Sequence, residues 1–249
     1  MASTSETGHA KNVANFEELN SVCSGFGPAY NPSKNNIKTA AMTTLLTSAR
    51  NSLQSLKAAK TVYDNATNSR EIAFSGLKKL STRIVNALSA TDSAQQTVDD
   101  AKTVNRKIQG QRADKKKPPI ITPIPENPPD NSLPIQISVS QQSYDNLVDN
   151  FTKLIQVVST EPLYTPNENE LKTVQLNTLL TNLKASNTAV INAHTAFSGA
   201  KISRDVVLYA QNTGLYDIAL EVKKYVKSVF GATSPQFHQV GKIHFTHPR

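Results

Sequence analysis

Cysteine, tryptophan and glycine are scarce in this sequence of 249 residues. Cys23 is the single cysteine, which excludes an intrachain disulfide and a metal site built on several cysteines. There is no tryptophan, and only 9 glycines, 8 phenylalanines and 7 tyrosines occur. Ala, Leu and Lys, which are abundant here, favour helices, whereas aromatic residues favour strands. We therefore expect an all-α fold.

Long hydrophobic runs are also missing. No apolar stretch approaches the roughly 18 residues that a membrane-spanning helix needs, and the segment from Met1 to Asn12 is polar. These features predict a cytoplasmic protein without integral membrane insertion. A membrane-active helical protein stays a distant alternative, because it would need a strongly amphipathic face with Trp or Phe.

Catalytic and metal-binding motifs are absent from the sequence, which has no phosphate-binding glycine loop, no HExxH and no convincing acid pair. Cys23 lacks the Gly-x-Ser-x-Gly pattern of a nucleophile turn, and we interpret it as a small buried packing residue. His238, His244 and His247 gather in the C-terminal tail without a nearby carboxylate or cysteine to complete a metal site. We expect no enzymatic activity and no cofactor.

An internal repeat is the strongest signal in the chain. Tyr30-Asn-Pro32 recurs as Tyr164-Thr-Pro166, and at this constant offset of 134 fifteen residues are identical between the first and second copies, ending with Arg70 and Arg204. With a one-residue adjustment, Asn15-Phe16 also matches Asn150-Phe151. The sequence therefore predicts a tandem duplication of a unit with a short helix before the Tyr-x-Pro segment.

A long helix is predicted after each proline, because the apolar residues keep a seven-residue step. The steps are Met42, Ala49, Leu56 and Tyr63 in the first copy and Leu176, Leu183, Val190 and Phe197 in the second. A helix from about Asn167 to Asn212 would have roughly 46 residues and span about 70 Å. Gly214 then precedes a closing helix at 215–230 that ends at Gly231, and we expect its counterpart at 93–109, ending at Gly110.

These patterns predict an elongated, all-α tandem duplication of a long-helix bundle with roughly three to four helices in each copy. The expected parts are a disordered N-terminus (1–13), a first helical repeat (14–112), a basic and proline-rich linker (113–136), a second helical repeat (137–231) and an irregular C-terminal tail (232–249). A coiled-coil-like seam would bury the apolar stripes.

The net charge of +8 lies in the first half of the chain, since residues 1–117 hold 17 Lys and Arg against 9 Asp and Glu, whereas residues 118–249 hold 10 against 10. Most of the excess comes from one stretch that could contact an anion or a nucleic acid, namely Lys102, Arg106, Lys107, Arg112, Lys115, Lys116 and Lys117. The stretch contains no aromatic residue, and basic runs beside linkers are commonly solvated, so both interpretations stay open.

Arg70 and Arg204 extend the seven-residue pattern by one further step, and each is followed by an acid, Glu71 or Asp205. A guanidinium at such a place could bind a ligand carboxylate or phosphate. The structural alternative is an ion pair, or an arginine whose stem packs while its head reaches water.

Three segments carry a resemblance to a known family: Tyr164–Lys172, Arg204–Tyr209 and Tyr225–Phe237. Together they resemble an uncharacterised family of Bacteroidetes proteins of similar size, over most of the second copy and more loosely over the first. The resemblance implies a bacterial, cytoplasmic protein and brings no assigned activity or site.

The sequence thus favours a non-enzymatic helical scaffold or protein-interaction module, which binds a protein partner or associates with itself. A nucleic-acid-associated protein that uses residues 102–117 is the alternative.

Overall fold

The computed structural model describes residues 4–111 and 142–247, and every regular element within these ranges is a helix. The expected all-α class is confirmed. The segment 113–136, expected to be a basic and proline-rich linker, lies outside the described residues. Nothing in the described part of the chain is long and apolar enough to be a membrane-spanning helix.

One helix precedes each Tyr-x-Pro segment: α1 (Thr4–Gly25) in the first copy and α5 (Tyr144–Thr160) in the second. Ser143 starts α5 by accepting a hydrogen bond from the backbone N–H of Asn146. Most of the segment 1–13, which was expected to be disordered, belongs to α1. Tertiary contacts explain this difference, because Asn12 is buried and exchanges two hydrogen bonds with the backbone of Thr246.

The long helices α2 (Thr39–Ser75) and α6 (Thr173–Tyr209) each have 37 residues. α6 is shorter than the roughly 46 residues expected for it, because it begins only after the 3₁₀ turn η3 (Asn169–Leu171) and ends at Tyr209. The matching turn η2 (Asn35–Ile37) precedes α2. The apolar stripe is buried at Met42, Ala49 and Leu56 and at its counterparts on α6. The start and end of α6 lie 134 residues after those of α2.

Two helices follow each long helix: α3 (Leu77–Ser89) and α4 (Gln95–Gln109) after α2, and α7 (Leu215–Phe230) and α8 (Pro235–Gly241) after α6. The closing helix at 215–230 is present as expected. The tail at 235–241 is helical rather than irregular, because Ser234 caps α8 and proline takes its first position. The expected glycine stops are seen at Gly110 and Gly231, both with positive φ.

The chain forms two compact units that cut across the sequence copies. Unit 1 comprises Met1–Asn65 and Ile191–Arg249, and unit 2 comprises Ala66–Val190. Unit 1 therefore combines the beginning of the first copy with the end of the second, and unit 2 combines the end of the first with the beginning of the second. α2 and α6 each contribute to both units. The compact units thus do not follow the boundaries 14–112 and 137–231 of the sequence repeats.

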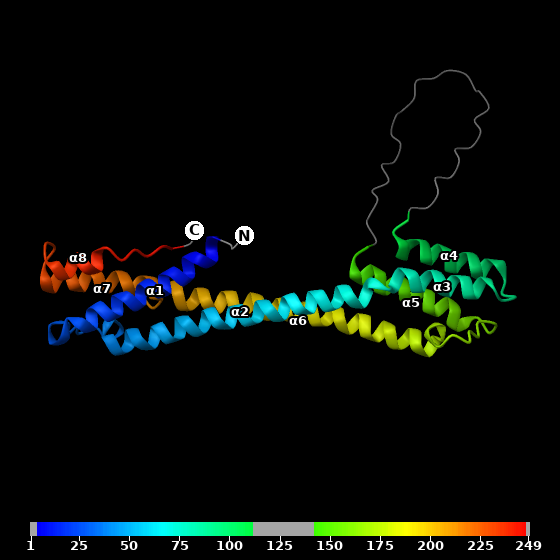
Figure 1. Cartoon of the computed structure of the whole chain (residues 1–249), viewed down its shortest axis with the longest axis horizontal. Coiled ribbons are helices and arrows are strands. Elements are labelled where there is room, and N and C mark those ends of the chain that lie inside the picture. The colour runs from blue at the N-terminus through cyan, green and yellow to red at the C-terminus, as the bar shows by residue number, and fades with distance from the viewer. Residues whose placement is uncertain (1–3, 112–141, 248–249) are drawn as a thin grey trace, which may run out of the picture. The chain divides into compact units, whose positions relative to one another are not determined.

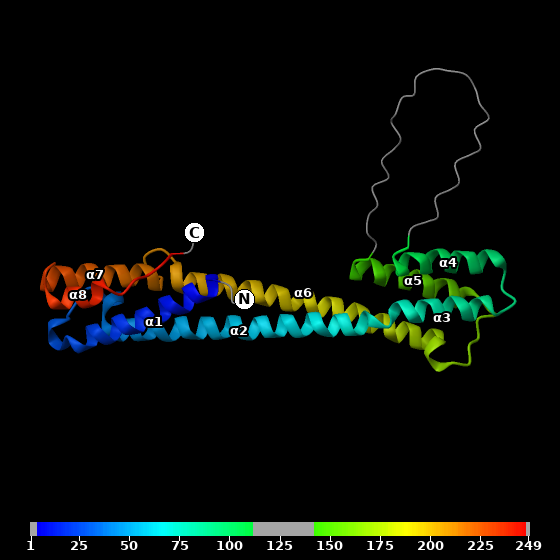
Figure 2. The ribbon, with the colours of Figure 1, turned by 45° about the horizontal axis from the view of Figure 1, so that its top comes forward.

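Each unit has its own hydrophobic core. In unit 1, α1, the first part of α2, the end of α6, α7 and α8 surround buried residues such as Phe16, Met42 and Val222. In unit 2, the end of α2, α3, α4, α5 and the first part of α6 surround Phe151, Ile84 and other apolar residues. Figures 1 and 2 show α7 and α8 beside α1 in unit 1, and α3 and α4 beside α5 in unit 2.

Candidate functional site

The described part of the basic stretch forms one face and the last turn of α4. Lys102 pairs with Asp99 one turn earlier, with 3.3 Å between Lys102 Nζ and Asp99 Oδ1. Arg106 and Lys107 occupy the last turn of the helix, where cations stabilise the helix dipole. The remaining candidates of this stretch lie outside the described residues: Arg112, Lys115, Lys116 and Lys117. Of the described residues of the stretch, Lys102 thus has an ion-pair partner on its own helix, and Arg106 and Lys107 lie where a helix favours cations.

Arg70 and Arg204 occupy different surroundings although they match in sequence. Arg204 is paired with the neighbouring Asp205, with 2.8 Å between the two groups, and only 11% of its side chain is exposed. The guanidinium of Arg70 lies over the ring of Tyr144 on α5, 4.1 Å from its centroid. The position on α1 that corresponds to Tyr144 is His9, which is hydrogen-bonded to Tyr209 instead. Both arginines therefore have partners within the fold.

The cysteine and the tail histidines are placed by packing. Cys23 is fully buried, and burial raises the pKa of its thiol to about 12, while a hydrogen bond with Tyr30 opposes the shift. The C-terminal residues pack into the core of unit 1 through Val240 and Ile243. Within the described residues, His, Cys, Asp and Glu side chains form no group that could hold a metal ion.

The two Tyr-x-Pro segments form the same buried hydrogen bond in both units. Tyr30 donates its hydroxyl to the carbonyl oxygen of Ile37 at 2.6 Å, and Tyr164 donates to that of Leu171 at 3.0 Å. Each tyrosine thereby ties the loop to the 3₁₀ turn before the long helix. The α3 helix packs on the turn at 169–171, and α7 packs on the turn at 35–37.

The counterpart of α7 is α3, so the expected counterpart at 93–109 is wrong. A glycine precedes each helix, Gly76 or Gly214, and four buried positions of α3 recur on α7 with an offset of 138. They are Leu77, Ser81, Ile84 and Leu88 on α3, and Leu215, Ala219, Val222 and Val226 on α7. The offset exceeds 134 because the turn between α6 and α7 is four residues longer than the one after α2.

When α3 is aligned with α7 at this offset, the two units differ beside the buried tyrosine. In unit 1, the ring of Tyr225 on α7 lies edge-on to Tyr30, with 5.3 Å between ring centroids and 90° between the planes. In unit 2, the corresponding residue of α3 is Ala87. The smaller side chain leaves space beside Tyr164.

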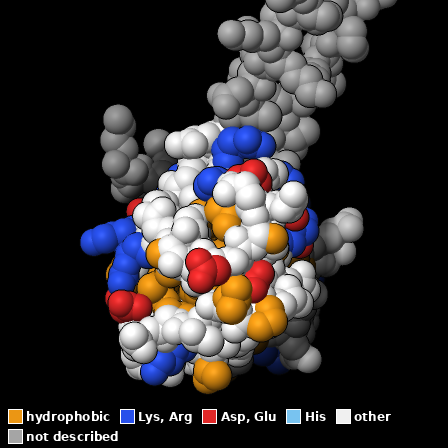
Figure 3. Space-filling view, turned by 90° about the vertical axis from the view of Figure 1, so that its right-hand side faces the viewer, with side chains coloured by type: hydrophobic (Ala, Val, Ile, Leu, Met, Phe, Trp, Pro, Cys, Tyr) orange, Lys and Arg blue, Asp and Glu red, His pale blue; other side chains and the backbone are white. Residues whose placement is uncertain are grey.

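A cleft of about 550 Å³ opens there, which we call the Tyr164 cleft. It is lined by residues at the end of α3 and just after it (between Arg83 and Thr91), by the loop 163–168 and by Leu171. Its volume lies within the roughly 300–1,000 Å³ of typical ligand-binding sites. The space-filling view onto this end of unit 2 shows apolar side chains at the surface with acidic ones beside them (Figure 3).

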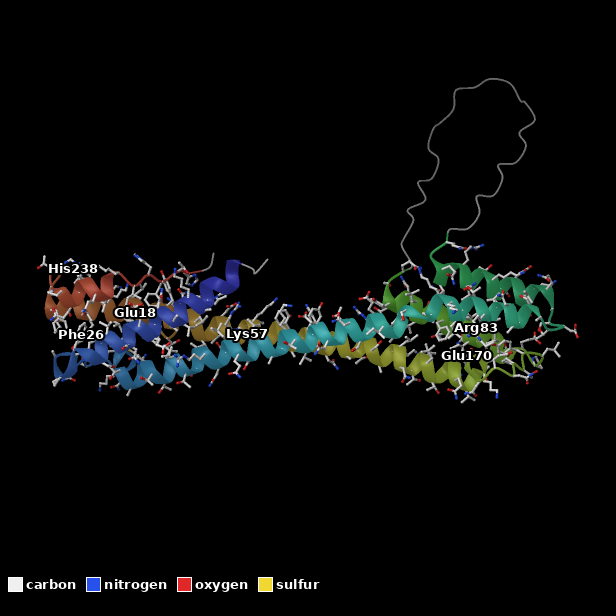
Figure 4. The ribbon with its side chains drawn as sticks, in the orientation of Figure 1. Glu18, Phe26, Lys57, Arg83, Glu170 and His238 are labelled. Carbon is white, nitrogen blue, oxygen red and sulfur yellow. The ribbon has the colours of Figure 1, made fainter. Side chains whose placement is uncertain are left out.

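Beside each buried tyrosine, an ion pair joins the loop or turn to the neighbouring helix, and the two ion pairs have the cation on opposite sides. In unit 1, Lys34 in the loop pairs with Glu221 on α7 at 2.6 Å. In unit 2, the cation is Arg83 on α3, which corresponds to Glu221, and it pairs with Glu170 in the turn (Figure 4). This pairing raises the pKa of Arg83 and lowers that of Glu170.

Glu168 gives the Tyr164 cleft a further negative charge. It lines the cleft at the position that corresponds to Lys34 in unit 1. Burial, followed by the charge of Glu168, raises the pKa of Tyr164 to about 12. The hydroxyl of Tyr164 is therefore a neutral hydrogen-bond donor at physiological pH.

In the sequence, Tyr164 marks the repeat and was not predicted to be a site residue. The signal that could have found the cleft is the replacement of Tyr225 by Ala87 between corresponding helices. This replacement is not visible at the offset of 134, because the offset increases by four residues after the long helix. At 134, Ala87 is aligned with a residue other than Tyr225.

Unit 1 has a smaller hollow of about 260 Å³ beside Arg204. Its lining includes His9, Leu53, Leu56 and Lys57, so it combines apolar walls with cations. It lies where the fold of unit 2 places Tyr144 against Arg70.

In comparisons with protein-family models, with curated proteins and with solved structures, nothing matches this chain.

Proposed function

We propose that this protein is a non-enzymatic helical scaffold that binds a partner protein at the Tyr164 cleft. The observation that supports the proposal is the cleft itself. At the corresponding place in unit 1, Tyr225 of the same chain lies against Tyr30, whereas in unit 2 Ala87 and the loop 163–168 line an open cleft beside Tyr164, which is itself buried.

A binding role fits the chemistry of the lining better than catalysis does. The lining residues of the cleft include no histidine, cysteine or lysine. Arg83 is engaged by Glu170, and the hydroxyl of Tyr164 is directed to the carbonyl of Leu171 with a raised pKa of about 12. Neither group is poised to accept or donate a proton near neutral pH.

The scaffold is proposed to descend from a tandem duplication, in agreement with the fifteen identical residues. The recurrence of the tyrosine hydrogen bond and of a 37-residue helix at an offset of 134 supports this origin. In this view the two copies exchanged their packing partners, so that each unit holds a tyrosine site, and only the site in unit 2 became available to a partner. A bacterial and cytoplasmic origin belongs to the same proposal and rests on the sequence resemblance alone.

The test is affinity capture from the native cell with three purified forms of the full chain. These are the unchanged protein, Ala87→Tyr, which fills the cleft, and Gln96→Tyr, which adds the same ring at an exposed position of α4 outside the cleft. We expect a partner that is retained by the unchanged protein and by Gln96→Tyr but is depleted at least about tenfold by Ala87→Tyr, a change equivalent to roughly 1.4 kcal/mol. Equal capture by all three forms would refute the Tyr164 cleft as the binding site.

A further inference from the structure

The hollow beside Arg204 in unit 1, which we call the Arg204 hollow, is apolar at positions where unit 2 is polar. In unit 2, the side-chain amide of Asn187 on α6 donates a hydrogen bond to Asp145 on α5 at 3.0 Å. The corresponding residues of unit 1 are Leu53 on α2 and Ala10 on α1, which cannot form this bond, and both line the hollow. A polar pair in one unit is thus replaced by apolar wall in the other.

The apolar wall and the size of the hollow define the body of a ligand. Leu56, which is buried, adds a third apolar side chain to Leu53 and Ala10. The volume of about 260 Å³ lies just below the range of about 300–1,000 Å³ for typical ligand sites, so an occupant has to be small. A short apolar group in the hollow would remove this wall from water, which is favourable in proportion to the area covered.

Arg204 brings a positive charge to the hollow and has one edge of its guanidinium group available. Asp205 accepts from Nε at 2.9 Å and lies 2.8 Å from Nη2. Among the described residues, none accepts a hydrogen bond from the remaining amino group, Nη1. Only 11% of the side chain is exposed, so water has little access to it. An anion at Nη1 would form a charge-assisted hydrogen bond, which is stronger than one between neutral groups.

The other charged side chains around the hollow leave a positive surplus. Lys57 and Lys60 on α2 also line it, and Figure 4 shows Lys57 on that helix. Asp64 neutralises Lys60 at 2.7 Å, as Asp205 does Arg204. Lys57 has no ion-pair partner within the ranges that the structure describes. Three cations therefore face two carboxylates, and the hollow is complementary to an anion.

We propose that the Arg204 hollow is a binding site for a small organic carboxylate with an apolar chain. The chain lies against Ala10, Leu53 and Leu56, and the carboxylate binds Nη1 of Arg204 and the ammonium group of Lys57. A guanidinium group suits this head group because its planar N–H donors match carboxylate oxygens. The site belongs to unit 1 and is independent of the binding role proposed for unit 2.

The experiment titrates the full chain with three probes and follows backbone amide signals by NMR. Octanoate has both the chain and the carboxylate, octylammonium has the same chain with the opposite charge, and acetate has the carboxylate without the chain. We expect octanoate to shift the signals of residues 10, 53 and 56 in a saturable way at millimolar concentration. Octylammonium and acetate should bind at least about tenfold more weakly, a change equivalent to roughly 1.4 kcal/mol.

Point variants assign the binding to the hollow. Ala10→Phe, and separately Leu53→Phe, should abolish the shifts by placing a ring in the space. Lys57→Gln should weaken octanoate binding about fivefold, the factor that corresponds to the roughly 1 kcal/mol of an exposed ion pair. The matched control is Lys224→Gln, an exposed lysine of α7 outside the lining, which should leave the affinity unchanged. Ala87→Tyr, which changes unit 2, should also leave it unchanged.

Three results would overturn the inference. They are the absence of saturable shifts with octanoate, equal binding of octanoate and octylammonium, and octanoate binding that persists in both phenylalanine variants. Circular dichroism melts establish that each variant is folded before it is titrated. Because the titration involves no cellular partner, its failure leaves the proposed role of the Tyr164 cleft intact, and failure of the capture experiment leaves this site intact.

Discussion

Removal of one hydroxyl group from Tyr164 tests the feature that both units share. The hydroxyl donates to the carbonyl oxygen of Leu171, and both residues are buried, with exposed fractions of 6% and 4%. Tyr164→Phe keeps the ring and its packing and leaves the carbonyl without this donor. An unsatisfied buried polar group costs about 1–3 kcal/mol, so we expect unfolding of unit 2 to become easier by roughly 1–2 kcal/mol.

The same change in unit 1 provides an internal comparison. Tyr30→Phe removes the donor to Ile37, at a shorter distance of 2.6 Å, and should cost a similar amount, about 1–2 kcal/mol. Tyr216→Phe is the matched control, because its hydroxyl takes no part in these two buried hydrogen bonds, and it should change stability by less than about 0.5 kcal/mol.

Alkaline pH adds a second measurement to this prediction. An unfolded tyrosine ionises near a pKa of about 10, whereas folded Tyr164 keeps its proton up to a pKa of about 12. The folded state therefore has its full advantage below pH 10 and loses it as the pH rises towards 12. Tyr164→Phe should show a shallower loss of stability over this range than the unchanged protein does.

The assay combines urea denaturation, followed by circular dichroism, with hydrogen exchange measured by mass spectrometry. Hydrogen exchange is needed because a chain with two compact units need not unfold in one step. Protection should fall around residues 163–172 in Tyr164→Phe and around residues 30–38 in Tyr30→Phe. The buried hydrogen bond is refuted as a stabilising element if two results are found together. Tyr164→Phe would be as stable as the unchanged protein at neutral pH, and its stability would fall as steeply with pH between about 10 and 12.

Three further outcomes are expected. Cys23 should react with a thiol reagent only after denaturation, because burial holds its pKa near 12; fast labelling of the native protein would contradict this. Gly214→Ala should destabilise unit 1, since a Cβ atom there would lie 2.5 Å from the backbone of Ala210, whereas Gly199→Ala, in open space on α6, should stabilise its helix by about 0.5–1 kcal/mol in thermal melts. If the alternative nucleic-acid role holds, replacement of the three lysines at 115–117 by alanine should weaken a salt-sensitive gel shift, and absent or salt-insensitive binding by the unchanged protein would eliminate that role.

Local features of the fold were largely predictable from the sequence. The seven-residue step of Met42, Ala49 and Leu56 predicted a long helix with a buried stripe, because helical periodicity is a property of adjacent turns. Gly110 and Gly231 marked helix ends, because positive φ favours glycine. The ends of the long helices were less accurate, since the 3₁₀ turns before them have no strong sequence signal.

The sequence by itself determined the helical class and the two matching tyrosine segments, because propensity, periodicity and capping act over a few residues. Only the tertiary structure decided which apolar stripes meet. Burial of apolar surface is non-directional. The apolar stripe of α3 therefore does not by itself indicate that α3 packs beside Tyr164, which belongs to the other sequence copy. That packing placed Ala87 where unit 1 has Tyr225, and it thereby opened the one site in this scaffold that we propose a partner to use.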